Sequence, residues 1–143
     1  MELKVTDRLG IEEGMVLRTL YVVISIRDPG TRKPIIPRTA GLRGILFLAF
    51  DDAEPPRDGS VTAEKIRLMS KRDAVTIWQF IRQHQDNVGT IVCHCEQGAS
   101  RSPAVAIALA EALQADTSEI VAYTSPNSFV YQLMKETMSL ETK

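Results

Sequence analysis

The sequence is poor in cysteine and lacks any long apolar run, and each shortage excludes a class of protein. Only Cys93 and Cys95 are cysteines among 143 residues, and a single residue separates them. Neighbours this close make a poor structural disulfide, and two thiols are too few for a cysteine-based zinc site. No apolar stretch approaches the roughly 20 residues that span a bilayer. We therefore expect a cytoplasmic protein that binds no membrane and needs no metal.

The positive and negative charges of the chain nearly cancel. The formal charge is −1, so no general attraction draws the chain to nucleic acid or to an anionic membrane. Its N-terminus lacks the basic start and apolar stretch of a signal peptide. With 44% hydrophobic residues the chain can bury a core, and its length predicts a single domain over residues 1–143.

Apolar runs bounded by glycine, proline or charge predict strands. The expected strands are Leu20–Ile26, Ile45–Phe50, Thr90–His94 and a weaker one at Leu3–Val5. Helical patterns lie between and after them. The first expected helix runs from a cap at Thr62 to about Gln85, and the second from Ser102 to about Gln114. A third, short helix is expected after a capping box formed by Asp116 and Glu119, and a fourth is expected to begin at Ser125 and Pro126. Their alternation predicts an α/β fold, with helices flanking a central, mainly parallel sheet in three layers.

Two connections are rich in proline and glycine and are expected to be surface loops. They are Asp28–Gly44 and Asp51–Ser60. Loops of this kind either join elements or carry functional residues.

The segment from His94 to Ser102, His-Cys-Glu-Gln-Gly-Ala-Ser-Arg-Ser, lies between a predicted strand and a predicted helix. A loop that enters a helix N-terminus presents free backbone N–H groups and the positive end of the helix dipole, which together bind anions. Gly98 relieves the backbone where the loop must bend, and the small Ala99 and Ser100 allow an anion to approach. The segment therefore predicts a phosphate site.

Three side chains in this segment have the chemistry of a cysteine-dependent phosphatase. A helix N-terminus and a nearby arginine favour the thiolate form of a cysteine, which makes Cys95 the candidate nucleophile. The guanidinium of Arg101 can bind two phosphate oxygens at once. Ser102 places a hydroxyl near the sulfur, where it would stabilise the thiolate and assist its departure. The alternative is an inert buried cysteine, as we expect for Cys93.

The pattern His-Cys, five residues, Arg, Ser resembles the signature of the protein tyrosine phosphatase superfamily. The fuller run through Ser102 and Pro103 most resembles its dual-specificity branch and the small bacterial relatives. The resemblance extends loosely from about Leu20 to Met134. It implies the cysteine phosphatase fold and a two-step reaction through a phosphocysteine, without metal or cofactor. It also implies a phosphate-binding loop made by Glu96, Gln97, Gly98, Ala99, Ser100 and Arg101.

Such a reaction needs a general acid, because an alkoxide or phenolate leaves more readily when protonated. Asp51 and Asp52 follow the second predicted strand, where the family places this acid. The alignment favours Asp52, with Asp51 as the alternative; the pair could also merely end the strand in solvent. Asn127 resembles a residue that holds the phosphate loop by hydrogen bonds, although a plain first-turn helix residue is the competing interpretation. His94 is expected to bond to backbone or neighbouring side chains and to tune Cys95.

These residues predict a protein phosphatase acting on phosphotyrosine, and also on phosphoserine and phosphothreonine. Its partners would be phosphorylated proteins or small phosphate monoesters. The loop contains no lysine, which argues against phosphoinositide substrates. Two alternatives remain open: a phosphoprotein-binding pseudophosphatase without turnover, and a rhodanese-like sulfurtransferase, which also uses a cysteine carried by a loop.

Overall fold

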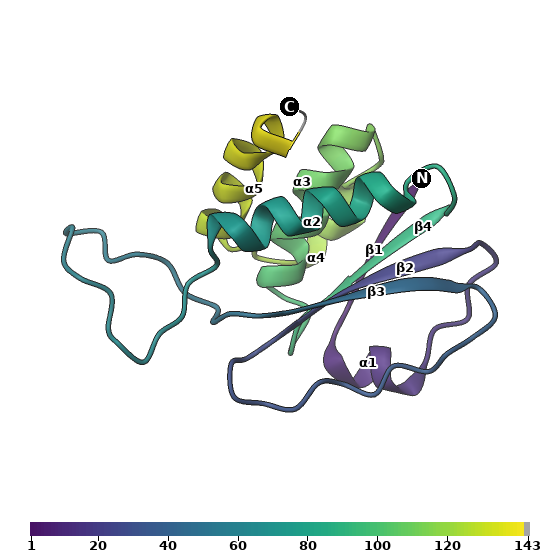
Figure 1. The fold of residues 1–143 in the computed structure, drawn as a ribbon, viewed down its shortest axis with the longest axis horizontal. Helices are drawn as coiled ribbons and strands as arrows, with labels where there is room; N and C mark the ends of the chain where they lie inside the picture. The colour runs from purple at the N-terminus through teal and green to yellow at the C-terminus, as the bar shows by residue number, and fades with distance from the viewer. Residues whose placement is uncertain (142–143) are drawn as a thin grey trace.

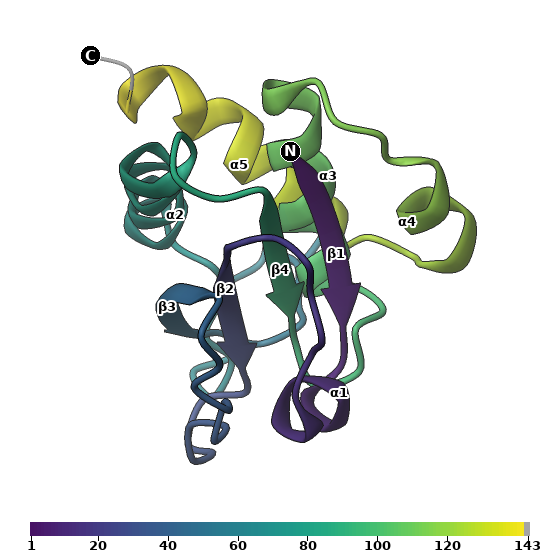
Figure 2. The same cartoon turned by 90° about the vertical axis from the view of Figure 1, so that its right-hand side faces the viewer.

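The computed structural model describes residues 1–141 and contains a parallel sheet of four strands in the order β1-β4-β2-β3. The strands are β1 (Glu2–Thr6), β2 (Tyr21–Arg27), β3 (Leu42–Ala49) and β4 (Thr90–His94). Every strand pair is parallel. The predicted α/β architecture is confirmed, and the weak strand near Leu3 is present as β1 at one edge (Figure 2).

Helices cover the two faces of the sheet unequally. The helices are α1 (Arg8–Glu13), α2 (Lys71–His84), α3 (Arg101–Leu113), α4 (Ser118–Tyr123) and α5 (Ser128–Glu141). Four of them, α2 to α5, lie on one face, and the short α1 lies on the other (Figure 1). Ile36, from the connection between β2 and β3, packs with Ile11 of α1 on that second face. Within residues 1–141, no helix is long and apolar enough to cross a bilayer.

The core explains why β2, β4 and α3 read as almost continuously apolar. All of β4, and all of β2 except Arg27, is buried between the two layers. In α3, every residue from Arg101 to Ala110 is buried, which confirms the expectation that this helix lies in the core. Burial of apolar surface at about 25 cal/mol per Å² makes this centre the main stabilising part of the fold.

The predicted start of α2 at Thr62 is wrong. Reciprocal hydrogen bonds define the true start: Ser70 Oγ accepts from the Asp73 amide at 3.0 Å, and Asp73 Oδ2 accepts from the Ser70 amide at 2.9 Å. This capping box satisfies amides that have no partner within the helix. Thr62 and the exposed Ile66 instead belong to the long connection that precedes α2.

The predicted capping box of Asp116 and Glu119 is also wrong. Asp116 accepts from the amide and the hydroxyl of Ser118, and no side-chain bond caps α4 at Thr117. A carboxylate two residues before an amide forms this local turn more readily than a box.

The last helix begins later than Ser125 and Pro126 suggested, at Ser128. Asn127 Oδ1 accepts from the Val130 amide at 3.0 Å, so asparagine satisfies the first turn. Two further differences concern β3, which begins at Leu42 rather than Ile45, and α1, which the sequence analysis missed. Helix α1 is only six residues long, and Asp7 caps it by accepting from the Gly10 amide.

The parallel arrangement places the carboxyl ends of all four strands at one edge of the sheet. Each strand delivers its following loop there, and ligands of open α/β sheets bind at such an edge. The segments that meet there begin at Asp7, Asp28, Phe50 and Cys95.

Candidate active site

A pocket of about 250 Å³ lies at the carboxyl end of the sheet. Its lining comes from the loops that follow β2, β3 and β4, and consists of Asp28, Asp52, Cys95, Glu96, Gln97, Ala99, Ser100 and Arg101. Predicted nucleophile, arginine and acid are therefore brought to one cavity.

The backbone of the loop from Cys95 to Arg101, the phosphate loop, is held from outside by hydrogen bonds to its carbonyl groups. The Glu96 carbonyl accepts from the Arg8 amide at 3.1 Å, and the Ala99 carbonyl accepts from the Ser125 amide at 2.9 Å. The Ser100 carbonyl accepts from the Asn127 amide at 3.0 Å.

In a planar trans peptide the C=O and the following N–H point in opposite directions. Because these three carbonyls face surrounding segments, the N–H groups of Gln97, Ser100 and Arg101 face the pocket that these residues line. Converging N–H groups at a helix N-terminus form an anion-binding nest.

Gly98 has a role that its position in the loop alone did not reveal. Its φ is +69°, a left-handed conformation that favours glycine. A Cβ atom built there would lie 2.8 Å from the Thr6 carbonyl oxygen, at the end of β1. Gly98 therefore permits both the bend of the loop and its close packing on β1, and it does not itself line the phosphate pocket.

Cys95 is buried at the base of the pocket, and its Sγ lies 3.1 Å from Ser102 Oγ. His94 lies behind it. Its Nδ1 is 3.1 Å from the Cys95 carbonyl, which only accepts, so Nδ1 carries the proton and Nε2 accepts from Ser25 Oγ at 2.6 Å. Burial lowers the pKa of His94, which agrees with this neutral tautomer. By contrast, burial raises the pKa of the Cys93 thiol, which lies in the core.

Arg101 is buried and is held by two contacts at one end of its guanidinium. Its Nη1 donates to the Phe50 carbonyl at 2.7 Å and pairs with Asp28 Oδ1 at 2.8 Å. Its Nε, however, has no hydrogen-bond partner, and it is the only buried side-chain nitrogen or oxygen atom in this state among the residues described. A buried donor without a partner is costly, which makes it a strong indication of a ligand.

The two candidate acids have different environments. Asp52 lines the pocket, and its Oδ1 accepts from Ser100 Oγ at 2.8 Å and from Asn127 Nδ2 at 2.9 Å. Asp51 is not part of the lining. Its Oδ2 accepts from the Arg67 amide and its amide donates to the Arg67 carbonyl, both at 2.7 Å. Asp51 therefore joins the start of the loop that presents Asp52 to Arg67, near the end of the same loop.

Asn127 contacts both loops. Its backbone amide donates to the Ser100 carbonyl of the phosphate loop, whereas its side chain donates to Asp52 and, at 3.2 Å, to the Ala53 carbonyl in the other loop.

The geometry agrees with solved structures of known fold. The chain superposes on human DUSP28 with a TM-score of 0.60 at 15% identity, over 98% of this chain and 93% of that one. Tk-PTP in its active form gives a TM-score of 0.54 at 15% identity, over 97% and 92%. The human tyrosine phosphatase-like serine/threonine/tyrosine-interacting protein gives 0.52 at 21% identity, over 87% and 80%.

The chain has the dual-specificity phosphatase fold. No protein-family model and no curated protein sequence matches it, so the likeness is one of three-dimensional structure. The fold implied by the motif from His94 to Ser102 is thereby confirmed.

The phosphatase fold also brings in residues that the sequence analysis missed. Asp28 follows β2 just as Asp52 follows β3, and a lone acidic residue after an apolar run is the signal that could have found it. Arg8 supports the phosphate loop through its amide and through an ion pair with Glu96 at 3.2 Å. Ser25 lies inside β2, and its contact with His94 depends on the pairing of β2 with β4, so no local sequence pattern predicts its role.

Proposed function

We propose that this protein hydrolyses phosphate monoesters of proteins, phosphotyrosine first and phosphoserine and phosphothreonine as well, through a phosphocysteine intermediate. The observation that carries this proposal is the unpartnered, buried Nε of Arg101 in a pocket shared with Cys95 and Asp52. A phosphate oxygen is the acceptor whose charge and geometry fit that donor.

Binding would use the backbone first. The N–H groups of Gln97, Ser100 and Arg101 bind the phosphate oxygens, while the guanidinium of Arg101 adds charge-assisted bonds. Asp28 and the Phe50 carbonyl hold Nη1 in place, so the guanidinium plane is oriented before substrate arrives. Contacts fixed in advance stabilise the transition state most, because they need no reorganisation.

In the first step the Cys95 thiolate attacks phosphorus, an S–P bond forms, and the bond from phosphorus to the leaving oxygen breaks. Asp52 transfers a proton to that oxygen. Its Oδ1 is engaged by Ser100 and Asn127, so Oδ2 is the oxygen we assign to the proton.

In the second step Asp52 accepts a proton from water, the water oxygen bonds to phosphorus, and the S–P bond breaks. The hydroxyl of Ser102, 3.1 Å from the sulfur, stabilises the departing thiolate. The products are inorganic phosphate and the free enzyme, with Asp52 again protonated.

The charges around the pocket support a protein rather than an inositol lipid as substrate. Asp28, which follows β2, and Glu96, within the phosphate loop, both line the pocket, and the loop contains no lysine. Further phosphates on a headgroup would meet these carboxylates and be repelled.

Hydrolysis of an activated aryl phosphate by the wild type, Cys95→Ser and Cys93→Ala tests the mechanism. We expect no turnover by Cys95→Ser, because a hydroxyl is a far weaker nucleophile, and near-normal turnover by Cys93→Ala, whose thiol lies outside the pocket. Acid quenching of the wild type should trap phosphate on Cys95, detected by mass spectrometry.

Three outcomes would contradict the proposal. Residual activity of purified Cys95→Ser would exclude the nucleophile. Saturable phosphate binding without turnover would support a pseudophosphatase. Thiocyanate formation from thiosulfate and cyanide, without phosphatase activity, would support a sulfurtransferase. Phosphotyrosine, phosphoserine and phosphothreonine peptides, with phosphoinositides alongside, would then rank the substrates.

A further inference from the structure

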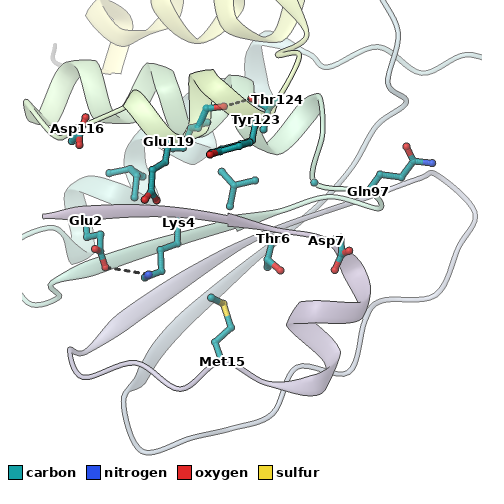
Figure 3. A pocket seen from close by; sticks show the side chains of 14 residues that line it. Glu2, Lys4, Thr6, Asp7, Met15, Gln97, Asp116, Glu119, Tyr123 and Thr124 are labelled. Carbon is teal, nitrogen blue, oxygen red and sulfur yellow. Dashed lines mark hydrogen bonds and ion pairs between the residues drawn. The ribbon is translucent and has the colours of Figure 1, made fainter.

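A second and larger hollow, of about 700 Å³, runs along β1 at the free edge of the sheet. It is lined by every residue from Glu2 to Asp7, by residues of α4 and its flanks, by Met15, and by Gln97 and Gly98. Consecutive residues of a strand face opposite sides of the sheet, so a hollow that all of them line must run along the edge of the strand. Figure 3 shows Glu119 and Tyr123 on one side of β1 and Met15 on the other.

The backbone of β1 has hydrogen-bonding groups directed into this groove. On the inner side, β1 pairs with β4, and the Glu2 amide donates to the Gly89 carbonyl at 2.9 Å. Because amides alternate in direction along a strand, those of Leu3 and Val5 point outward. Among the described residues, no strand pairs with β1 on that side. An open edge of this kind accepts an added strand.

The charges of the groove are one-sided, although the whole chain has a net charge of only −1. Carboxylates from both walls line it: Glu2, Asp7, Asp116 and Glu119. Among the described residues that line the groove, the single basic side chain is that of Lys4, which is paired with Glu2 at 3.6 Å. The groove therefore attracts cations, and it repels nucleic acid and anionic lipid.

An aromatic side chain completes the surface. Tyr123 is 86% exposed on α4 and lines the groove, where it presents a large apolar face to a ligand. A lysine or arginine over such a ring gains a cation–π contact in addition to its attraction to the carboxylates.

From the open edge, the acidic walls and the exposed tyrosine, we propose that β1 docks an extended, basic segment of a partner protein as an additional parallel or antiparallel strand. The segment would bond to the backbone of Leu3 and Val5 and place lysine or arginine side chains near Glu119 and Tyr123. A second copy of this chain fits less well, because a symmetric contact would bring acidic groove against acidic groove. The inference does not depend on the proposed catalysis, since docking requires no phosphate.

The test uses the full chain and a short unphosphorylated peptide, capped at both ends, in which lysine and valine alternate. Two derivatives carry N-methyl groups, one on the valines and one on the lysines. Because a strand bonds to its neighbour through alternate amides, we expect only one derivative to bind at least about 10-fold more weakly, and the other to change less than about threefold. Nuclear magnetic resonance titration should shift the Leu3 and Val5 amides.

Charge reversal in the groove provides the second measurement. Glu119→Lys should weaken binding of the unmodified peptide by about fivefold, roughly 1 kcal/mol, whereas Glu136→Lys on α5 should have little effect. Activity toward a small aryl phosphate should be unchanged in both variants, which separates this inference from the proposed function.

Other results would overturn the inference. These are equal loss of binding by both methylated peptides, no loss by either, or shifts confined to the phosphate loop. A dimer detected by sedimentation equilibrium, together with Leu3 and Val5 amide signals that shift with protein concentration, would show that the edge binds a second copy instead.

Discussion

The phosphate loop and the loop that presents Asp52 meet at one pocket, but they are held in very different ways. Two segments, the start of α1 and the connection between α4 and α5, make three hydrogen bonds to the backbone of the phosphate loop, and Gly98 packs directly on β1. The other loop, residues 51–70, projects away from the body (Figure 1) and depends on side chains at its start. Asp51 closes its base, and Asp52 and Glu54 reach the start of α5 through Asn127, Ser128 and the Phe129 amide.

The phosphate loop is the more rigid part of the site, and the loop of residues 51–70 is the more mobile part. Backbone bonds survive most substitutions, so the anion nest tolerates changes of side chain around it. Contacts made by a few exposed side chains break easily, and loops with few buried contacts open at low cost. We therefore expect the phosphate loop to act as a fixed cradle and residues 51–70 to control delivery of the acid.

We expect the largest effect at Arg101, whose side chain connects the two loops through its hydrogen bond to the Phe50 carbonyl. Arg101→Lys retains the charge but loses the planar guanidinium, in which Nη1 contacts Asp28 and Phe50 while Nε remains for the phosphate. We expect kcat/KM to fall about 100-fold or more, roughly 3 kcal/mol of transition-state stabilisation.

Arg67→Lys is the matched control for steady-state kinetics, because Arg67 holds the neighbouring loop through backbone atoms alone. A near-normal rate for Arg101→Lys would show that this side chain does not bind the phosphate.

The next largest effect should separate the two neighbouring carboxylates. Asp52→Asn should slow hydrolysis of a poor leaving group, such as tyrosyl or alkyl phosphate, by about 100-fold, and that of an activated aryl phosphate much less. Asp51→Asn should cause only a modest general loss, because an amide oxygen still accepts from the Arg67 amide. Rates should be measured across a series of leaving groups.

If only Asp51→Asn showed this dependence on the leaving group, the general acid would be Asp51 and not Asp52. Dependence in neither variant would place the acid outside this loop.

A smaller effect should follow from loosening the contact between the Asp52 loop and α5. Asn127→Ala removes the bonds to Asp52 and Ala53, and also the bond that Oδ1 accepts from the Val130 amide at the start of α5, but it retains the backbone bond to Ser100. We expect about a 10-fold lower kcat/KM for poor leaving groups and unchanged inhibition by inorganic phosphate. Ser128→Ala, which loses only the Glu54 contact, should change the rate about twofold. Weakened phosphate inhibition in Asn127→Ala would mean that the side chain supports the cradle instead.

The smallest effect concerns His94, behind the cradle. Burial holds its pKa below the ordinary value near 6.5, so the unfolded chain takes up a proton first as the pH falls. The free energy of unfolding should therefore be constant above about pH 7 and decrease as the pH falls below about 6.5.

Urea unfolding between about pH 7.5 and 5.5 measures this dependence. His94→Gln should flatten it, whereas His84→Gln, at the end of α2, should leave it intact. Equal slopes in the wild type and His94→Gln would show that another group is responsible.

Much of the cradle could be predicted because its determinants are neighbours in the chain. A β-rich apolar run ending at His94, a loop with Gly98, and an apolar helix beginning at Arg101 are local features. Strand Thr90–His94 was predicted to the residue, and the burial of α3 followed from its composition. The starts of α2, α4 and α5 were misplaced, because capping bonds of single side chains decided them.

The α/β fold, and the loop between β4 and α3 that carries the candidate nucleophile, followed from the sequence, since backbone geometry and hydrophobic periodicity act over short distances. Tertiary structure alone decided which of two adjacent aspartates faces the pocket, because Asp52 is selected by Ser100 and Asn127, and Asp51 by Arg67. It also decided that Asp28 orients Arg101, and that β1 is left with an open acidic edge. These outcomes depend on contacts between residues far apart in the chain, which no local pattern records.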